Sequence, residues 1–110
     1  MSGNADTNYE VTFTDAATAQ FQKILDYLFF KLGNVQATNS VREDIEETAR
    51  RLSHVADKLK PCTDPKLHSL GYRTIHLKRH RYFMLYKIMN NQVYVIGIYH
   101  DLQDYENILH

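Results

Sequence analysis

Residues 81–100 read RYFMLYKIMNNQVYVIGIYH, and this stretch decides the architecture because it holds two strands and the turn that joins them. Both halves are rich in aromatic and β-branched residues, which favour strands. Asn90 and Asn91 between them suit the two-residue turn of a tight hairpin, because asparagine accepts the left-handed backbone region. Such a turn fixes which residues oppose each other. The predicted pairs are Ile88 with Val93, Tyr86 with Val95, Phe83 with Ile98, and Arg81 with His100.

The residues before this hairpin predict a further strand, Tyr72–Leu77, which closes a second hairpin around Arg79 and His80. This closure would place Lys78 opposite Arg81. Lys78, Arg81 and His100 would then share one end and one face of the sheet. The convergence depends on the register, since a one-residue bulge would move the side chains beyond it to the other face.

The N-terminal half of the chain predicts one strand followed by two helices. Tyr9–Thr14 alternates as a strand does. Thr14 or Asp15 can cap the first helix, and Gly33 and Asn34 can end it because both tolerate positive φ. The other predicted elements are a second helix at Val35–Leu59, a loop that contains Pro61 and Pro65, the strands Tyr72–Leu77, Tyr82–Ile88 and Gln92–His100, and a short C-terminal helix.

The order β-α-α-β-β-β predicts an α+β fold, in which a helical hairpin packs on one face of an antiparallel sheet. We expect residues 1–8 to form a disordered tail and residues 9–110 a single domain. The face predicted to meet the helices carries Ile75, Leu77, Met84, Ile88, Val93 and Val95. The other face carries Thr74, His76, Lys78, Arg81, Phe83, Lys87, Tyr94 and His100. On that face Phe83, Leu85, Ile96 and Ile98 require cover from the C-terminal tail or from a partner.

Charge is segregated along a chain whose formal net charge is zero. Residues 1–64 hold ten acidic and seven basic residues, residues 65–100 hold six basic residues and no acidic one, and residues 101–110 hold three acidic residues. Such segregation concerns the surface field and its partners rather than the fold. Within the second helix, ion pairs on a solvated face are predicted for Glu43, Asp44, Glu46 and Glu47 with Arg42, Arg50 and Arg51.

The composition excludes several classes of site. The single Cys62 leaves no internal disulfide and fits a reducing cytoplasm. The six histidines show no metal-ligand spacing, so we expect no metal and no cofactor. The sequence has no signal-peptide pattern, and no apolar run approaches the roughly 20 residues that a membrane span needs. We therefore expect a soluble, cytoplasmic protein.

Cations beside a histidine suit a phosphodiester substrate. Arginine can grip phosphate at two points, and histidine can give a proton to a leaving oxygen. In RNA the 2′-hydroxyl can act as the nucleophile, so cleavage would need no metal. Tyr72, Tyr82 and Tyr99 could stack on bases. The alternative is that basic residues at a hairpin tip are solvated surface, and that a histidine at a strand end is structural.

Several segments, taken in order, resemble the RelE/ParE superfamily of bacterial toxins from type II toxin–antitoxin modules. They are YEVTFTDAA, the helical hairpin, the proline-containing loop into LGYR, RYFMLYKI, VYVIGIYH and DLQDYENIL, which together cover nearly all of residues 9–109. The resemblance implies a small toxin that a cognate antitoxin wraps and neutralises. It also implies one of two targets: RelE-like and YoeB-like members cut mRNA on the ribosome without metal, whereas ParE-like members poison DNA gyrase and lack that catalytic set.

On this resemblance, Lys78 and Arg81 match the basic hairpin positions, and His100 lies where YoeB-like members carry a catalytic histidine. The leading hypothesis is ribosome-dependent mRNA cleavage, with His100 as general acid or base and with Arg81 and Lys78 stabilising the phosphate. RNA-binding roles are predicted for Arg73, Arg79, His80, Tyr82 and Tyr99. The alternatives are a gyrase poison whose basic face binds protein, and an inactive member that binds its antitoxin. The DLQD sequence after His100 is closer to the ParE-like ending.

Overall fold

The computed structural model describes residues 8–102, and its elements follow the predicted order. Most of the tail predicted at residues 1–8 and the helix predicted at the C-terminus lie outside this range. The elements are β1 (Glu10–Phe13), α1 (Asp15–Asp26), the π-helical turn η2 (Tyr27–Lys31), α2 (Val35–Val55), the 3-10 turn η3 (Ala56–Lys58), α3 (Pro65–Ser69), β2 (Tyr72–His76), β3 (Tyr82–Met89) and β4 (Gln92–His100).

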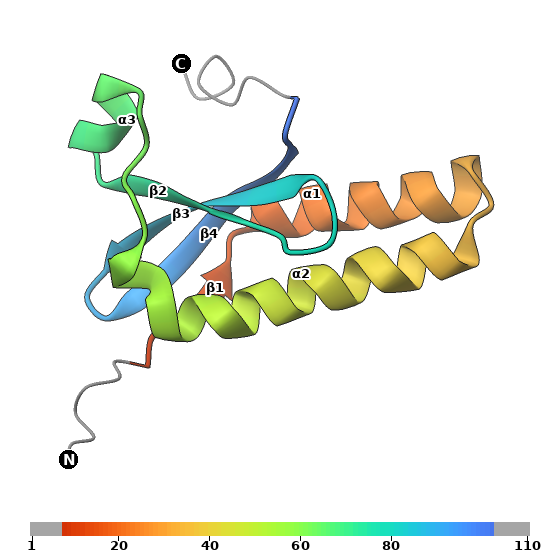
Figure 1. Cartoon of the computed structure of the whole chain (residues 1–110), viewed down its shortest axis with the longest axis horizontal. Helices are drawn as coiled ribbons and strands as arrows, with labels where there is room; N and C mark the ends of the chain where they lie inside the picture. The colour runs from red at the N-terminus through yellow and green to blue at the C-terminus, as the bar shows by residue number, and fades with distance from the viewer. Residues whose placement is uncertain (1–7, 103–110) are drawn as a thin grey trace.

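The strands β2, β3 and β4 form the predicted antiparallel arrangement, and α1 and α2 run side by side as a hairpin (Figure 1). β1 joins the edge of β4 in the parallel direction, so the strand order is β1-β4-β3-β2. The chain between β1 and β4 contains the helical hairpin, α3, β2 and β3, and this long connection is what a parallel pair requires. The α+β class and the element order are confirmed, and the parallel edge strand makes the sheet mixed.

The helix ends follow local hydrogen-bonding rules. Thr14 caps α1, because its side-chain oxygen accepts a hydrogen bond of 3.2 Å from the backbone N–H of Ala17. Gly33 has the positive φ (61°) that ends the first helical segment. Asn34 does not share that conformation; its Oδ1 instead caps α2 by accepting from Ala37 N at 2.9 Å. One residue therefore ends a helix and the next begins another, which makes the hairpin connection short.

The turn between β3 and β4 is the predicted two-residue turn. Asn90 and Asn91 have φ of 51° and 65°, as this turn requires. The nearest predicted pairs are confirmed, namely Ile88 with Val93 and Tyr86 with Val95.

A β-bulge then changes the register between Leu85 and Tyr86, and Ile96 is the additional residue on β4. Beyond the bulge, Phe83 pairs with Tyr99 and Tyr82 pairs with His100. The predicted pairs of Phe83 with Ile98 and of Arg81 with His100 are therefore wrong. Because side chains alternate along a strand, the extra residue also moves Ile98 to the helix-facing core.

Gly97 fits this bulge because the ring of Tyr99 lies where a Cβ atom would be. A Cβ on Gly97 would lie 2.6 Å from Cζ of Tyr99 and nearer still to Cε2. Carbon atoms in van der Waals contact are roughly 3.5–4.0 Å apart. The glycine thus allows the tyrosine ring to cover the strand just past the bulge.

Two hydrophobic clusters lie on the two faces of the sheet. The cluster between the sheet and the helices includes Leu25, Val41, Ile45, Leu52, Ile75, Met84, Tyr86, Val93, Val95 and Ile98. The cluster on the other face contains Cys62, Leu67, Phe83, Leu85 and Tyr99. The segment predicted as a loop forms α3, and Leu67 from α3 belongs to the same cluster as Phe83 and Leu85. The cover predicted from the C-terminal tail lies outside the described residues.

Candidate functional site

The candidate site lies at the end of the sheet where residues 77–81 connect β2 to β3 and where β4 ends. β2 and β3 follow the predicted register up to the pair of His76 with Phe83, where the ladder stops. Lys78 and Arg81 therefore belong to a loop rather than to opposed strands. Two backbone bonds close this loop, from Leu77 N to Tyr82 O at 3.0 Å and from Tyr82 N to His80 O at 2.9 Å. The side chains of Lys78, Arg79 and Arg81 are exposed.

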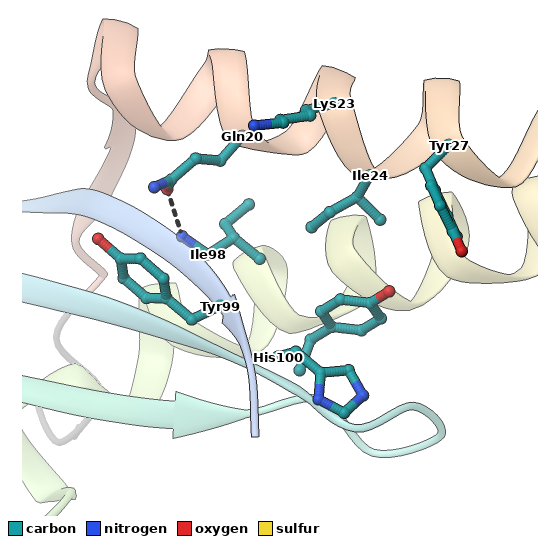
Figure 2. A pocket seen from close by; sticks show the side chains of 8 residues that line it. Gln20, Lys23, Ile24, Tyr27, Ile98, Tyr99 and His100 are labelled. Carbon is teal, nitrogen blue, oxygen red and sulfur yellow. Dashed lines mark hydrogen bonds between the residues drawn. The ribbon is translucent and has the colours of Figure 1, made fainter. Parts of the chain in front are cut away.

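His100 lies on the helix-facing side of this sheet end. Its ring meets that of Tyr82 edge to face, with the centroids 5.4 Å apart. Its Nδ1 accepts a hydrogen bond of 3.2 Å from Leu102 N, so a proton on the neutral ring is carried by Nε2. Figure 2 shows the ring of Tyr99 turned away from that of His100, as adjacent residues of a strand require.

A cleft of about 370 Å³ opens between α1 and this end of β4 (Figure 2). Gln20 anchors its wall, because Oε1 of Gln20 accepts a hydrogen bond of 2.8 Å from Ile98 N. Burial, followed by the charge of Tyr27, raises the pKa of the Tyr82 phenol, so this group stays protonated near neutral pH. The lining residues are Gln20, Lys23, Ile24, Tyr27, Tyr82, Ile98, Tyr99 and His100.

Arg81 does not share the position of His100. The Arg81 carbonyl accepts a hydrogen bond of 2.9 Å from Asp101 N, so Arg81 aligns with the residue after His100. Asp101 in turn lies 3.5 Å from Nδ1 of His76. The predicted placement of Arg81 opposite His100 fails because of the bulge at Ile96. The catalytic roles proposed for Lys78, Arg81 and His100 remain predictions.

Asp44 of α2 packs against residues 77–81, the basic loop between β2 and β3. It is 1% exposed, so its predicted place on a solvated helix face is wrong. Its Oδ2 accepts hydrogen bonds from Arg79 N at 3.0 Å and from His80 Nδ1 at 2.7 Å. The other ring nitrogen of His80 lies 3.3 Å from Oγ of Ser40, one turn earlier on α2. The sequence carries a signal for the burial of Asp44 but not for its partner, since Ser40, Asp44 and Thr48 repeat every four residues beside the apolar stripe.

Two further residues that were predicted to bind RNA, Arg73 and Tyr99, make contacts within the fold. The Arg73 guanidinium donates to the carbonyls of Leu59 at 2.6 Å and Asp57 at 3.3 Å, where the second helical segment ends. Tyr99 is 4% exposed, and its ring packs 5.8 Å from that of Phe83. Arg73 and Tyr99 therefore have structural partners, as His80 does, whereas Arg79 and Tyr82 lie at the sheet end.

Within residues 8–102, no three side chains of the His, Cys, Asp and Glu types come together as ligands for one metal ion. Among these residues, no helix combines the length and apolar character needed to cross a membrane.

The comparisons with known proteins identify one family and solved structures with a similar fold. The model of the family described as the ParE toxin of the type II toxin–antitoxin system, parDE, matches residues 11–105. A structure of the chromosomal ParDE toxin–antitoxin system from P. aeruginosa is 21% identical, with a TM-score of 0.70 over 86% of this chain and 97% of that chain. A chain of the RelBE2 toxin–antitoxin complex from Mycobacterium tuberculosis is 21% identical, with a TM-score of 0.55 over 84% of this chain and 98% of that one.

The search of curated protein sequences finds no match. At 21% identity, the two solved structures show the shared fold. The family model covers most of the chain and includes the sheet end described above. The chain therefore belongs to the family of ParE toxins of type II toxin–antitoxin systems.

Proposed function

We propose that this toxin arrests growth in the cytoplasm by poisoning DNA gyrase, and that a cognate antitoxin neutralises it. The family supports the gyrase target, since the resemblance to ParE-like toxins implies this mode of action. The observation that carries the proposal is the bulge at Ile96, which gives Arg81 and His100 different positions along the sheet. Both structural relatives come from toxin–antitoxin assemblies, which supports an antitoxin as partner.

A nuclease requires a proton donor and a cation that reach the same phosphate. Here His100 lines the cleft beside α1, whereas Arg81 aligns with Asp101. Arg73 and His80, which were predicted to bind RNA, are hydrogen-bonded within the fold. The arrangement therefore fits a protein-binding surface better than a site built around a scissile phosphate.

The exposed cations of the loop define that surface. Lys78, Arg79 and Arg81 project from a short segment whose backbone is held against α2. Arginine is well suited to protein interfaces because its planar group makes several directed hydrogen bonds and is weakly hydrated. An acidic region of the target would match this loop in charge.

The cleft beside α1 favours a second candidate function, ribosome-dependent mRNA cleavage. Lys23 lines the same cleft as His100, together with Tyr27 and Tyr82. An ammonium group, an imidazole and two phenol rings could hold a nucleotide by charge and stacking. For this second function, Lys23 rather than Arg81 would bind the phosphate together with His100.

One experiment separates the two functions. Purified toxin is added to a gyrase supercoiling and DNA-cleavage assay and, in parallel, to a translation reaction in which mRNA ends are mapped. We expect gyrase inhibition that Arg81→Glu weakens by at least about tenfold and that His100→Ala retains. Cuts in ribosome-bound mRNA that His100→Ala and Lys23→Ala abolish, with gyrase unaffected, would instead establish the second function.

A further inference from the structure

Asp44 is a buried carboxylate directly beneath an exposed loop of positive charge. Asp44 is 1% exposed, whereas Lys78, Arg79 and Arg81 of the loop are exposed. Moving an ionised carboxylate out of water is strongly unfavourable unless hydrogen bonds and opposite charge compensate for the lost hydration. The compensation here comes from the loop itself, so the acid and the loop backbone depend on each other.

Asp44 contacts the middle of the loop, at Arg79 and His80. Oδ2 accepts from the backbone N–H of Arg79 at 3.0 Å and from His80 Nδ1 at 2.7 Å. An ionised carboxylate only accepts hydrogen bonds, so Nδ1 of His80 carries a proton. Nε2 of the same ring lies 3.3 Å from Ser40 Oγ, so α2 holds the ring at two points one helical turn apart.

A second contact from α2 holds the start of the loop. Arg51 donates a hydrogen bond of 2.7 Å to the carbonyl of His76, the last residue of β2. Oδ1 of Asp44 also lies 4.0 Å from Nε of Arg79, so the contacts from α2 act on backbone groups, on His80 and on the Arg79 side chain. They therefore fix the path of the loop and leave the side chains of Lys78 and Arg81 at the surface. Figure 1 shows the connection between β2 and β3 extending over α2, consistent with these bonds.

We propose that Asp44 is a positioning residue of the toxin, which holds residues 77–81 in the one conformation that presents Lys78, Arg79 and Arg81 to the target. This rests on the proposed function, in which the loop contacts the target. A loop that is already ordered loses less conformational entropy on binding than one that must be fixed by the partner. Asp44 itself lies too deep to touch a partner.

Charge alone predicts the opposite effect. Removal of Asp44 would make the loop region more positive and would strengthen its attraction to an acidic surface. A positioning role predicts weaker action, because the cations lose their fixed arrangement. The direction of the change therefore distinguishes the two explanations.

The test compares three variants. Asp44→Ala removes both the charge and the acceptor, whereas Asp44→Asn removes the charge and keeps one oxygen that can accept from Arg79 N and His80 Nδ1. Glu47→Ala is the matched control, since Glu47 is an exposed acid of the same helix and its loss changes net charge equally. Growth arrest after induction and backbone amide exchange of the purified toxin are measured for each.

We expect Asp44→Ala to speed exchange at the Arg79 amide by at least about tenfold while the amide of Val93 in the core is unchanged. Growth arrest should need about tenfold more toxin, with Asp44→Asn and Glu47→Ala within about twofold of the parent. An Asp44→Ala variant with a mobile loop and full toxicity, or a toxicity loss matched by Glu47→Ala, would overturn the proposal.

If Asp44→Ala does not fold, His80→Ala supplies the same comparison, because it removes the ring from the loop and leaves α2 intact. His80→Ala should raise exchange at Arg79 and lower toxicity in parallel, and unchanged toxicity with raised exchange would overturn the proposal. Neither readout depends on the identity of the target. A toxin that arrests growth without inhibiting gyrase would therefore refute the proposed target and still test the role of Asp44.

Discussion

Substitution of Gly97 by alanine tests the account of the bulge most directly. The φ angle of Gly97 lies outside the left-handed region, so alanine is compatible with the backbone and only the added methyl group matters. That group would lie 2.6 Å from Cζ of Tyr99. The ring has little room to retreat, because Tyr99 is 4% exposed and packs against Phe83.

The cost follows from the two ways in which the clash can be relieved. If the strand shifts and Tyr99 stays, overpacking costs about 1–3 kcal/mol. If the ring leaves its site, the lost burial of one large side chain costs about 1.5–3 kcal/mol. We therefore expect Gly97→Ala to lower the free energy of unfolding by about 2 kcal/mol, a large share of the roughly 5–15 kcal/mol typical of a domain.

Urea denaturation of Gly97→Ala, Tyr99→Ala and the double variant measures the effect. In the Tyr99→Ala background the methyl group meets no ring, so Gly97→Ala should cost nothing there or add about 0.5 kcal/mol of stability by restricting the unfolded chain. The expected coupling energy is about 2 kcal/mol. Equal effects of Gly97→Ala in both backgrounds, or an effect below about 0.5 kcal/mol in the parent, would refute the reasoning.

Three further changes test other parts of the fold. Burial raises the pKa of the Tyr86 phenol well above its usual value of 10.0. The protonated phenol therefore adds to the free energy of unfolding below about pH 10, and this contribution is lost as the pH rises further. Tyr86→Phe should cost about 1 kcal/mol at pH 7, and urea titrations should show this difference shrinking by up to about 1.4 kcal/mol per pH unit above pH 10. Asn34→Ala removes the cap of α2 and should cost about 1 kcal/mol in the same assay, with Asn34→Ser close to the parent. Arg73→Ala leaves the carbonyl of Leu59 without this donor and should lower stability by about 2 kcal/mol, whereas Lys87→Ala, on the neighbouring strand, should cost less than half as much.

Local chemistry in the sequence predicted the hairpin turn and the pairs close to it. Asn90 and Asn91 adopt the positive φ that two-residue turns need, and Ile88 pairs with Val93 as expected. The register beyond Tyr86 could not be read in the same way, because counting residues outward from a turn assumes an uninterrupted ladder. Gly97 within a strand was the available signal, since isolated glycines often mark bulges.

The buried role of Asp44 was hidden by its neighbours along the chain. Glu43, Glu46 and Glu47 are exposed on the same helix, so composition alone suggested one solvated face. The partner of Asp44 lies 36 residues away at His80, and no local pattern predicts a contact of that range. Spacing was more informative than residue type, because Asp44 lies three residues after Val41 and next to Ile45, among the buried positions of α2.

The bulge at Ile96 decides which side chains lie near His100, and it therefore bears on the activity of the protein. Without it, Arg81 would oppose His100 and the two side chains would share one face, as a phosphate site requires. With it, His100 meets Tyr82 and lines the cleft beside α1, whereas Arg81 follows the loop that Asp44 holds. One additional residue thus divides a single cluster of charge into a cleft with a histidine and a separate cationic loop.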